Sequence, residues 1–295
     1  MKVSQYTVHS PRTLPEALNI LKDATVRPIA GGTDVMVQIK DDLVKETELL
    51  NLSYIMDLNY IRDDGDFIRV GALTTYSDLI RSQLVNEYSP VLVEAARTVG
   101  AVQIQNRGTL AGNVGNASPA GDGLPPLFAT GAKIKLQSAA SEREVDIGDY
   151  FLGVRKTVRQ PNELITEVSV RKMKPGDYYF FKKIGLRSAN AISLASVAAV
   201  LVPAEVLTFK EARIAMGAVA PTVIRAKGAE AAILNCQLTD EKMKEVGRLA
   251  SEEARPITDI RATAEYRKQA IAGAVYEGLY EIVNGFRSPV NGSGA

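Results

Sequence analysis

The sequence has almost none of the side chains that bind transition metals or act as strong nucleophiles. Its 295 residues include one cysteine, Cys236, and one histidine, His9. A cysteine-ligated iron–sulfur cluster needs about four thiolates, and a zinc site usually draws on several Cys or His side chains. Neither site can be built from this pair alone. A nucleophilic mechanism with histidine as the base would depend on His9, close to the N-terminus, and is disfavoured.

Charge of one sign and long apolar runs are also lacking. The 35 Lys and Arg residues nearly balance the 34 Asp and Glu residues, which disfavours a nucleic-acid or polybasic membrane surface. The longest nearly unbroken apolar stretch, 192–202, is about half of what a membrane span requires and predicts a buried strand. One cysteine allows no internal disulfide, and no apolar signal core follows the charged start. We therefore expect a cytoplasmic protein without a membrane span.

The pattern of apolar residues divides the chain into three folded parts. Residues 1–58 alternate extended and helical patterns and are expected to form a first subdomain. A second subdomain is expected at 59–174 and a last domain at 175–288. The remaining tail, 289–295, is expected to be disordered. Strands are predicted at 6–8, 27–30, 49–52, 67–72, 178–184, 192–202 and 212–218, and helices near 14–21, 35–39, 76–84, 91–99, after 239 and at 264–284.

A glycine loop, AGGTD at 30–34, stands at a predicted strand-to-helix turn. A pyrophosphate needs converging backbone N–H groups, and only small residues let the chain come that close. The Thr33 hydroxyl would be an added donor. By themselves, however, glycines at the end of a strand more often simply form a turn.

A second loop has a related composition, GTLAGN at 108–113 followed by ASPAGD at 117–122. It offers further backbone donors and the hydroxyls of Thr109 and Ser118, and Asp122 is a candidate acceptor for ribose or ribityl hydroxyls. The alternative is that Asp122 caps a helix starting at Leu124. The surrounding run, 106–126, is rich in Gly, Asn and Pro and is expected to be irregular. No Rossmann or Walker motif is present, so a dinucleotide would need a different fold.

These motifs resemble those of the flavoprotein subunits of molybdenum hydroxylases, which include carbon monoxide, xanthine and nicotinate dehydrogenases and quinoline oxidoreductase. The loops are similar to that family's AGGTD and GTIGGN…ASPxxD motifs, with Ala111 in place of the more usual glycine. The similarity continues in order through YFLGVRKT at 150–157, ELI at 163–165, KKIGLR at 182–187, AMGAVAP at 215–221 and DIRATAEYR at 259–267.

The resemblance implies an α+β fold, with a two-subdomain FAD-binding domain of the PCMH/vanillyl-alcohol-oxidase-like type followed by an α/β C-terminal domain of the CO dehydrogenase flavoprotein type. It implies FAD as the cofactor, with the pyrophosphate at the two loops, Asp122 near the sugar part and Ile165 near the isoalloxazine. The expected cofactor-binding residues are Ala30, Gly31, Gly32, Thr33, Asp34, Val35, Thr109, Gly112, Asn113, Ser118, Asp122 and Ile165.

The implied function is electron transfer within a complex, because the protein would bind and orient a cofactor that carries the chemistry. Electrons would come from 2Fe-2S clusters of a small partner subunit, next to a large subunit with the molybdopterin-type molybdenum cofactor, in a dimer of heterotrimers. An external acceptor such as NAD would take them up. No side chain is assigned a catalytic role, and the substrate and the acceptor stay open.

Two other functions are compatible with parts of the sequence. A self-sufficient flavin oxidoreductase would need a polar substrate pocket over the flavin and a base, and the single histidine disfavours it. A scaffold that has lost its flavin is disfavoured by the intact Gly31, Gly32, Gly112 and Asn113. Arg155 and Arg187, in two of the motifs above, are expected to be solvated or to form structural salt bridges rather than to act in catalysis.

Overall fold

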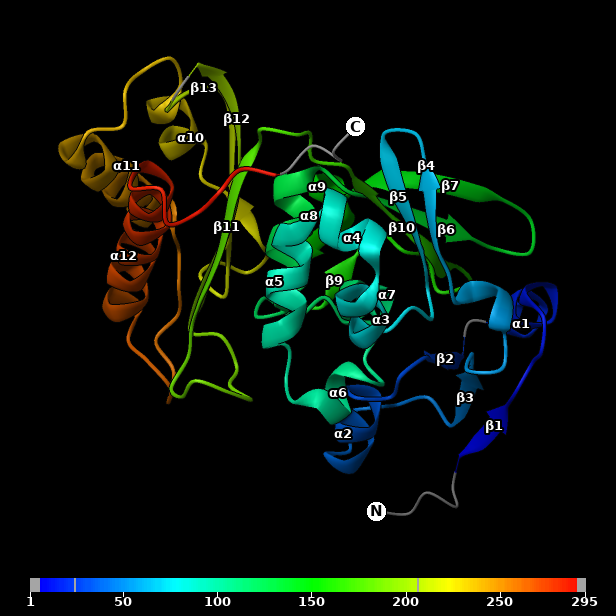
Figure 1. Ribbon diagram of the computed structural model, residues 1–295. Coiled ribbons are helices and arrows are strands. Elements are labelled where there is room, and N and C mark those ends of the chain that lie inside the picture. Colours follow the sequence, from blue (N-terminus) through cyan, green and yellow to red (C-terminus); the bar gives the residue numbers. More distant parts are fainter. Residues whose placement is uncertain (1–5, 24, 206, 291–295) are drawn as a thin grey trace.

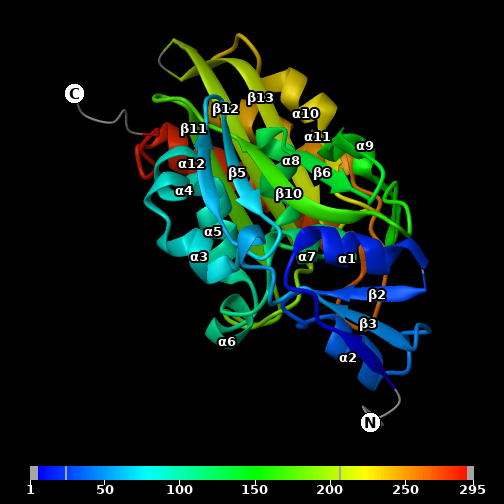
Figure 2. The same ribbon diagram turned by 90° about the vertical axis from the view of Figure 1, so that its right-hand side faces the viewer.

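The computed structural model describes residues 6–23, 25–205 and 207–290. Its first part is a parallel three-stranded sheet in the order β1-β3-β2. Figure 2 shows helices α1 and α2 on opposite sides of this sheet. The elements are β1 (Thr7–His9), α1 (Leu14–Ile20), η2 (Leu21–Asp23), β2 (Val26–Ile29), α2 (Val35–Lys40), β3 (Glu48–Asn51) and η3 (Met56–Leu58).

The second part is an antiparallel sheet in the order β4-β5-β10-β6-β7. Its central strand β10 is buried over all but its last residue, because helices cover one face and a polar network covers the other. The strands are β4 (Ile61–Asp64), β5 (Phe67–Gly71), β6 (Lys133–Gln137), β7 (Glu142–Asp146) and β10 (Leu164–Arg171), with a small pair β8 (Phe151–Gly153) and β9 (Lys156–Thr157). The helices are α3 (Tyr76–Arg81), α4 (Gln83–Tyr88), α5 (Pro90–Thr98), α6 (Val102–Gln105), α7 (Leu110–Asn116), α8 (Leu124–Thr130) and α9 (Ile147–Tyr150).

The expectation that 106–126 is irregular is wrong, because α7 lies within this run and α8 begins in it. Thr109 caps α7: its hydroxyl oxygen accepts a hydrogen bond from the Gly112 N–H at 2.9 Å. Leu110 and Val114, one turn apart, are fully buried. Helix α8 tolerates a proline in its first turn, where a backbone N–H has no partner within the helix. Capping and burial thus override the poor helix propensity of the run.

The C-terminal domain is an antiparallel sheet, β11-β12-β13-β14, that stands between two groups of helices (Figure 1). Ala198 and Val200 on one face of β12 belong to the core shared with the N-terminal part of the chain, whereas Val197 and Ala199 on the other face pack with the C-terminal helices. The apolar run 192–202 is therefore a strand buried on both faces, although it begins at Ala195. The elements are β11 (Tyr178–Ile184), β12 (Ala195–Glu205), β13 (Thr208–Gly217), β14 (Ile224–Arg225), α10 (Lys227–Ile233), α11 (Asp240–Glu253) and α12 (Ala264–Val283).

The chain after α12 returns to the linker between the two parts. Val290 exchanges backbone hydrogen bonds with Gly176 and Asp177, each 2.9 Å long, and only 6% of it is exposed. The expectation that disorder begins at residue 289 is therefore wrong for Val290, because its side chain joins the core. Residues 291–295 of the expected disordered tail lie outside the described residues.

Within 6–23, 25–205 and 207–290, no helix has the length and apolar character needed to cross a membrane.

Candidate cofactor site

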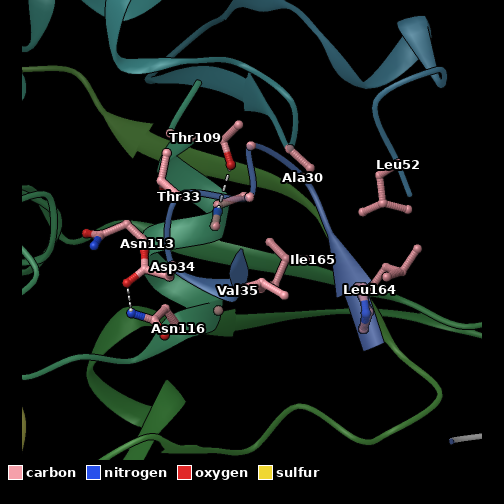
Figure 3. A pocket seen from close by; sticks show the side chains of 18 of the residues that line it. Ala30, Thr33, Asp34, Val35, Leu52, Thr109, Asn113, Asn116, Leu164 and Ile165 are labelled. Atoms are coloured by element: carbon pink, nitrogen blue, oxygen red, sulfur yellow. Dashed lines mark hydrogen bonds between the residues drawn. The ribbon is translucent and has the colours of Figure 1, made fainter. Parts of the chain in front are cut away.

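A pocket lies where the first subdomain meets α7 and β10 (Figure 3). The space between its walls, counted out to the open solvent at its mouth, is about 1080 Å³. Both glycine loops line it. Of the residues expected to bind the cofactor, those brought together here are Ala30, Gly31, Gly32, Thr33, Asp34, Val35, Thr109, Gly112, Asn113 and Ile165.

The two loops form one continuous wall rather than two separate contact points. A Cβ atom added to Gly31 would lie 1.7 Å from the carbonyl oxygen of Arg107, and one added to Gly108 would lie 3.4 Å from the Thr33 hydroxyl oxygen. Backbone therefore packs directly on backbone. Glycine is required at position 31 by this close approach, and at position 32 by a positive φ of 77°.

Several backbone N–H groups of this wall are free to bind an anion. The N–H groups of Gly32, Thr33 and Ala111 donate no hydrogen bond within the described part of the chain. Gly112 differs from the expectation, because its N–H already binds Thr109. The Thr109 hydroxyl keeps its own proton for a further acceptor. Anionic phosphate oxygens are the natural partners of such a group of donors.

Two buried polar atoms at the pocket wall lack a partner among the described residues. They are the Tyr76 hydroxyl and the Asn113 side-chain oxygen. Both lie next to Gly123, where an added Cβ would be 2.7 Å from the hydroxyl and 3.0 Å from the amide oxygen. Burial raises the pKa of Tyr76 well above its ordinary value, and the charges of Asp122 and Asp34 add to this. Tyr76 is therefore a protonated hydrogen-bond donor.

The opposite side of the pocket is apolar. Leu52, Leu164 and Ile165 line it, with Val35 nearby (Figure 3). Ile165 also approaches α7 closely, since a Cβ at Gly115 would lie 3.3 Å from its Cδ1 atom. A polar wall facing an apolar one suits a ligand that joins phosphates to flat ring systems.

Asp122 and Ser118, both expected to bind the cofactor, are not among the lining residues. Asp122 is buried, and its carboxylate accepts hydrogen bonds from the Lys183 ammonium at 2.6 Å and the Ser193 hydroxyl at 2.5 Å. Both donors belong to the C-terminal domain. Burial raises the pKa of Asp122, whereas Lys183 and Ser193 lower it. The alternative role as a helix cap is wrong, because Gly123 is the N-cap of α8 and no side chain caps it.

Residues that sequence reasoning missed complete the pocket. Asn116 lies between the two quoted parts of the second loop, and its spacing gave no sign that it faces Asp34. Arg27 lies on β2, just before the first loop, whereas Arg159 is far from both loops along the chain and only the fold brings it here. Loss of hydration on burial lowers the pKa of Arg159. Gly108 and Ala111 belong to the second loop that was expected to meet the pyrophosphate, and the missed lining residues are Arg27, Pro28, Leu52, Ala72, Tyr76, Val99, Ile104, Gly115, Asn116, Arg159, Glu163 and Leu164.

Arg155 and Arg187 are both exposed, and neither forms a salt bridge within the described ranges, so of the two expected roles the solvated one is found. The Arg187 guanidinium donates to the Asn190 carbonyl at 3.1 Å and again at 2.5 Å. Arg155 instead donates to the side-chain oxygen of Asn116 at 2.8 Å. The Arg155–Asn116 hydrogen bond lies at the edge of the pocket, because Asn116 is one of the lining residues.

Fold and site define a class of protein: a two-domain flavoprotein that binds FAD without a Rossmann motif. Residues 4–172 match the family model described as FAD binding domain in molybdopterin dehydrogenase. Residues 179–282 match the CO dehydrogenase flavoprotein C-terminal domain. The chain belongs to the family of FAD-binding medium subunits of molybdenum hydroxylases.

Relatives support the assignment over nearly the whole chain. The glyceraldehyde dehydrogenase medium chain of Sulfolobus acidocaldarius is 30% identical over 92% of this chain and 95% of its own length. The carbon monoxide dehydrogenase medium chain of Hydrogenophaga pseudoflava is 28% identical over 91% and 93%. A solved structure of carbon monoxide dehydrogenase from that organism, lacking the Mo-pyranopterin moiety, matches with a TM-score of 0.90 and 29% identity over 94% and 96%.

The site fits the cofactor of this family. Gly31 packs on the Arg107 carbonyl with no side chain between them, so the two loops present main-chain groups along one wall. The free N–H groups of Gly32, Thr33 and Ala111 among the described residues are donors suited to phosphate oxygens. FAD is thus the cofactor, and bound FAD supplies the capacity to accept and release one or two electrons. The chain's own residues bind and orient it.

Proposed function

We propose that this chain is the electron-transfer subunit of a molybdenum hydroxylase complex, holding the FAD through which electrons pass from 2Fe-2S centres of a partner subunit to an external acceptor such as NAD. The observation that carries the proposal is a complete FAD pocket in a chain with one cysteine. A cluster of the kind held by four thiolates must then be supplied by another chain.

Within the pocket, we assign the pyrophosphate to the polar wall and the ring systems to the apolar side. Gly32, Thr33 and Ala111 would supply backbone donors, and Thr109 a hydroxyl. Ile165 would pack on a ring. Asp122 and Ser118 stay proposed as residues near the sugar part, with Asp122 acting chiefly through its bonds to the C-terminal domain. No side chain is required as a general acid or base.

The proposed partners are a small 2Fe-2S subunit and a large molybdopterin subunit in a dimer of heterotrimers. The relatives support a multi-subunit assembly, since several are themselves medium chains. The near balance of charges supports the absence of a nucleic-acid partner. We propose a cytoplasmic complex, in keeping with a chain that cannot form an internal disulfide.

The proposal is tested by comparing the purified subunit with the reconstituted complex. The subunit alone should carry flavin and pass electrons from an artificial donor to a dye, but no purine, pyridine or aldehyde substrate should bleach its flavin. Adding the two partner subunits should restore substrate-dependent bleaching, followed by reduction of NAD or another acceptor. Bleaching by substrate in the isolated chain would refute the relay and support a self-sufficient oxidoreductase.

A further inference from the structure

Asn116, at the C-terminal end of α7, joins two charged residues that never touch each other. Its amide nitrogen donates to the Asp34 carboxylate at 2.9 Å (Figure 3). Its amide oxygen accepts hydrogen bonds from the Arg155 guanidinium at 2.8 Å and from the Gln38 amide at 2.9 Å. Since every contact pairs a donor with an acceptor, only one orientation of the Asn116 amide satisfies all three.

The backbone holds Arg155 in place for this contact. Arg155 has a φ of 55°, in the left-handed region that non-glycine residues seldom adopt. Its N–H donates to the carbonyl of Ala117 at 3.1 Å, and Ala117, which ends α7, has a φ of 49°. A conformation of this kind persists only where its surroundings fix it. The turn between β8 and β9 is thereby tied to the end of α7, beside Asn116.

The contact between Arg155 and Asn116 places a cation near Asp34, whose negative charge would oppose binding of an anionic ligand. Asp34 lies in the loop that is proposed to receive the pyrophosphate, and an uncompensated carboxylate there would repel it. Asp34 is exposed in the open pocket, where water screens its charge, but a bound dinucleotide would displace that water. Two adjacent anions in a drier site need a nearby cation.

We propose that Arg155, acting through Asn116, is a positioning residue that offsets the charge of Asp34 and so lets the anionic pyrophosphate bind beside it. Although part of Asp34 is exposed, burial of the rest of its surface raises its pKa, and the charge of Arg155 and the hydrogen bond from Asn116 oppose that rise. The other groups facing this carboxylate carry no charge that could do the same. Gln38 is neutral, Tyr76 stays protonated, and Arg27 binds Gln38 at 3.1 Å and pairs with Glu46 at 3.8 Å instead of contacting Asp34.

The test is the dissociation constant of FAD, measured by flavin fluorescence from about pH 4 to about pH 7.5 at fixed ionic strength, a range that begins near the ordinary pKa of an aspartate. In Arg155→Gln, Asp34 loses its cation. At high pH the ionised carboxylate should weaken FAD binding on the order of tenfold relative to the unaltered chain. As the pH falls, protonation of Asp34 removes the repulsion, so the affinity should recover. A purely structural loss would weaken binding equally at every pH.

Matched variants separate charge from structure. Arg155→Lys keeps the cation and should leave the pH profile flat. Asp34→Asn combined with Arg155→Gln removes both charges and should restore binding at high pH. Arg248→Gln, which removes an exposed arginine on α11 that pairs with Glu252, should match the unaltered chain. A pH-independent loss in Arg155→Gln, no loss at all, or a double variant that stays weak would overturn the inference.

A further variant covers the case in which Arg155→Gln does not fold. Asp34→Asn alone leaves Arg155 without its counter-charge, so FAD should bind several-fold more tightly at low than at high ionic strength. An affinity independent of salt would contradict the charge balance. The inference rests on the proposed position of the pyrophosphate and not on the electron route. Because FAD affinity needs no partner subunit, failure of the relay would leave these results unchanged.

Discussion

Gly31 and the carbonyl group of Arg107 are in direct backbone contact, although 76 positions separate them in the sequence. A Cβ atom at position 31 would lie 1.7 Å from that carbonyl oxygen. The first glycine loop is thus seated on the segment leading into the second, and the two loops cannot move independently. Four predictions follow from this contact and from others at the site.

Replacing Gly31 with alanine should separate the two loops. Because the added methyl would meet backbone rather than a flexible side chain, relief requires a shift of the chain, which costs about 1–3 kcal/mol of folding free energy. Flavin content per purified chain should fall sharply, and the unfolding midpoint in urea should decrease. Gly148→Ala is the matched control, since nothing lies within 4 Å of its Cβ position. Full flavin content in Gly31→Ala would show that the loops are not one binding wall.

Replacing Thr109 with valine removes the cap of α7 while keeping the shape of the side chain. The Gly112 N–H would lose its 2.9 Å partner, and the helix should lose roughly 0.5–2 kcal/mol of stability. FAD binding should also weaken, because a hydroxyl at the phosphate wall is lost. Thr109→Ser retains the cap and should resemble the unaltered chain. Chemical denaturation and flavin titration of both variants provide the measurement.

Replacing Lys183 with methionine should make stability depend on pH through Asp122. Removing one member of this buried pair, 2.6 Å apart, is expected to cost on the order of 3 kcal/mol at neutral pH. Without Lys183, burial raises the pKa of Asp122 further above its unfolded value. The folded variant then binds a proton more readily than the unfolded chain, so its stability should recover as the pH falls towards about 4 and decline as the pH rises. If the difference in denaturation midpoint between Lys183→Met and the unaltered chain were the same at every pH, the predicted role of Asp122 would be contradicted.

Comparing Asp122→Ala with Lys183→Met separates two roles of Asp122. If its carboxylate binds a sugar hydroxyl of FAD, Asp122→Ala should weaken FAD by about 1.5–3 kcal/mol, whereas Lys183→Met should leave affinity nearly intact. If it acts through the domain contact, both variants should weaken FAD to a similar degree. Equilibrium titration of FAD, with circular dichroism to verify folding, decides between these outcomes.

The local sequence predicted much of the fold because caps, turns and apolar periodicity act over a few residues. The helix after Thr239 begins where its cap predicts, and the strand at 178–184 has the predicted bounds. The same reasoning gave the wrong prediction for 106–126, because α7 is stabilised by burial of Leu110 and Val114 against elements that are distant in the chain. Propensity alone carries no information about such burial.

The sequence by itself determined the cofactor class, because two glycine loops in the family's order, with further family motifs after them, can be identified from the amino-acid sequence alone. Only the tertiary structure decided how the loops cooperate. It placed Gly31 on Arg107, turned Asp122 towards Lys183 and joined Asp34 to Arg155 through Asn116. These contacts link residues that are far apart in the chain, and their energies depend on distance and burial in space. No spacing along the sequence encodes them.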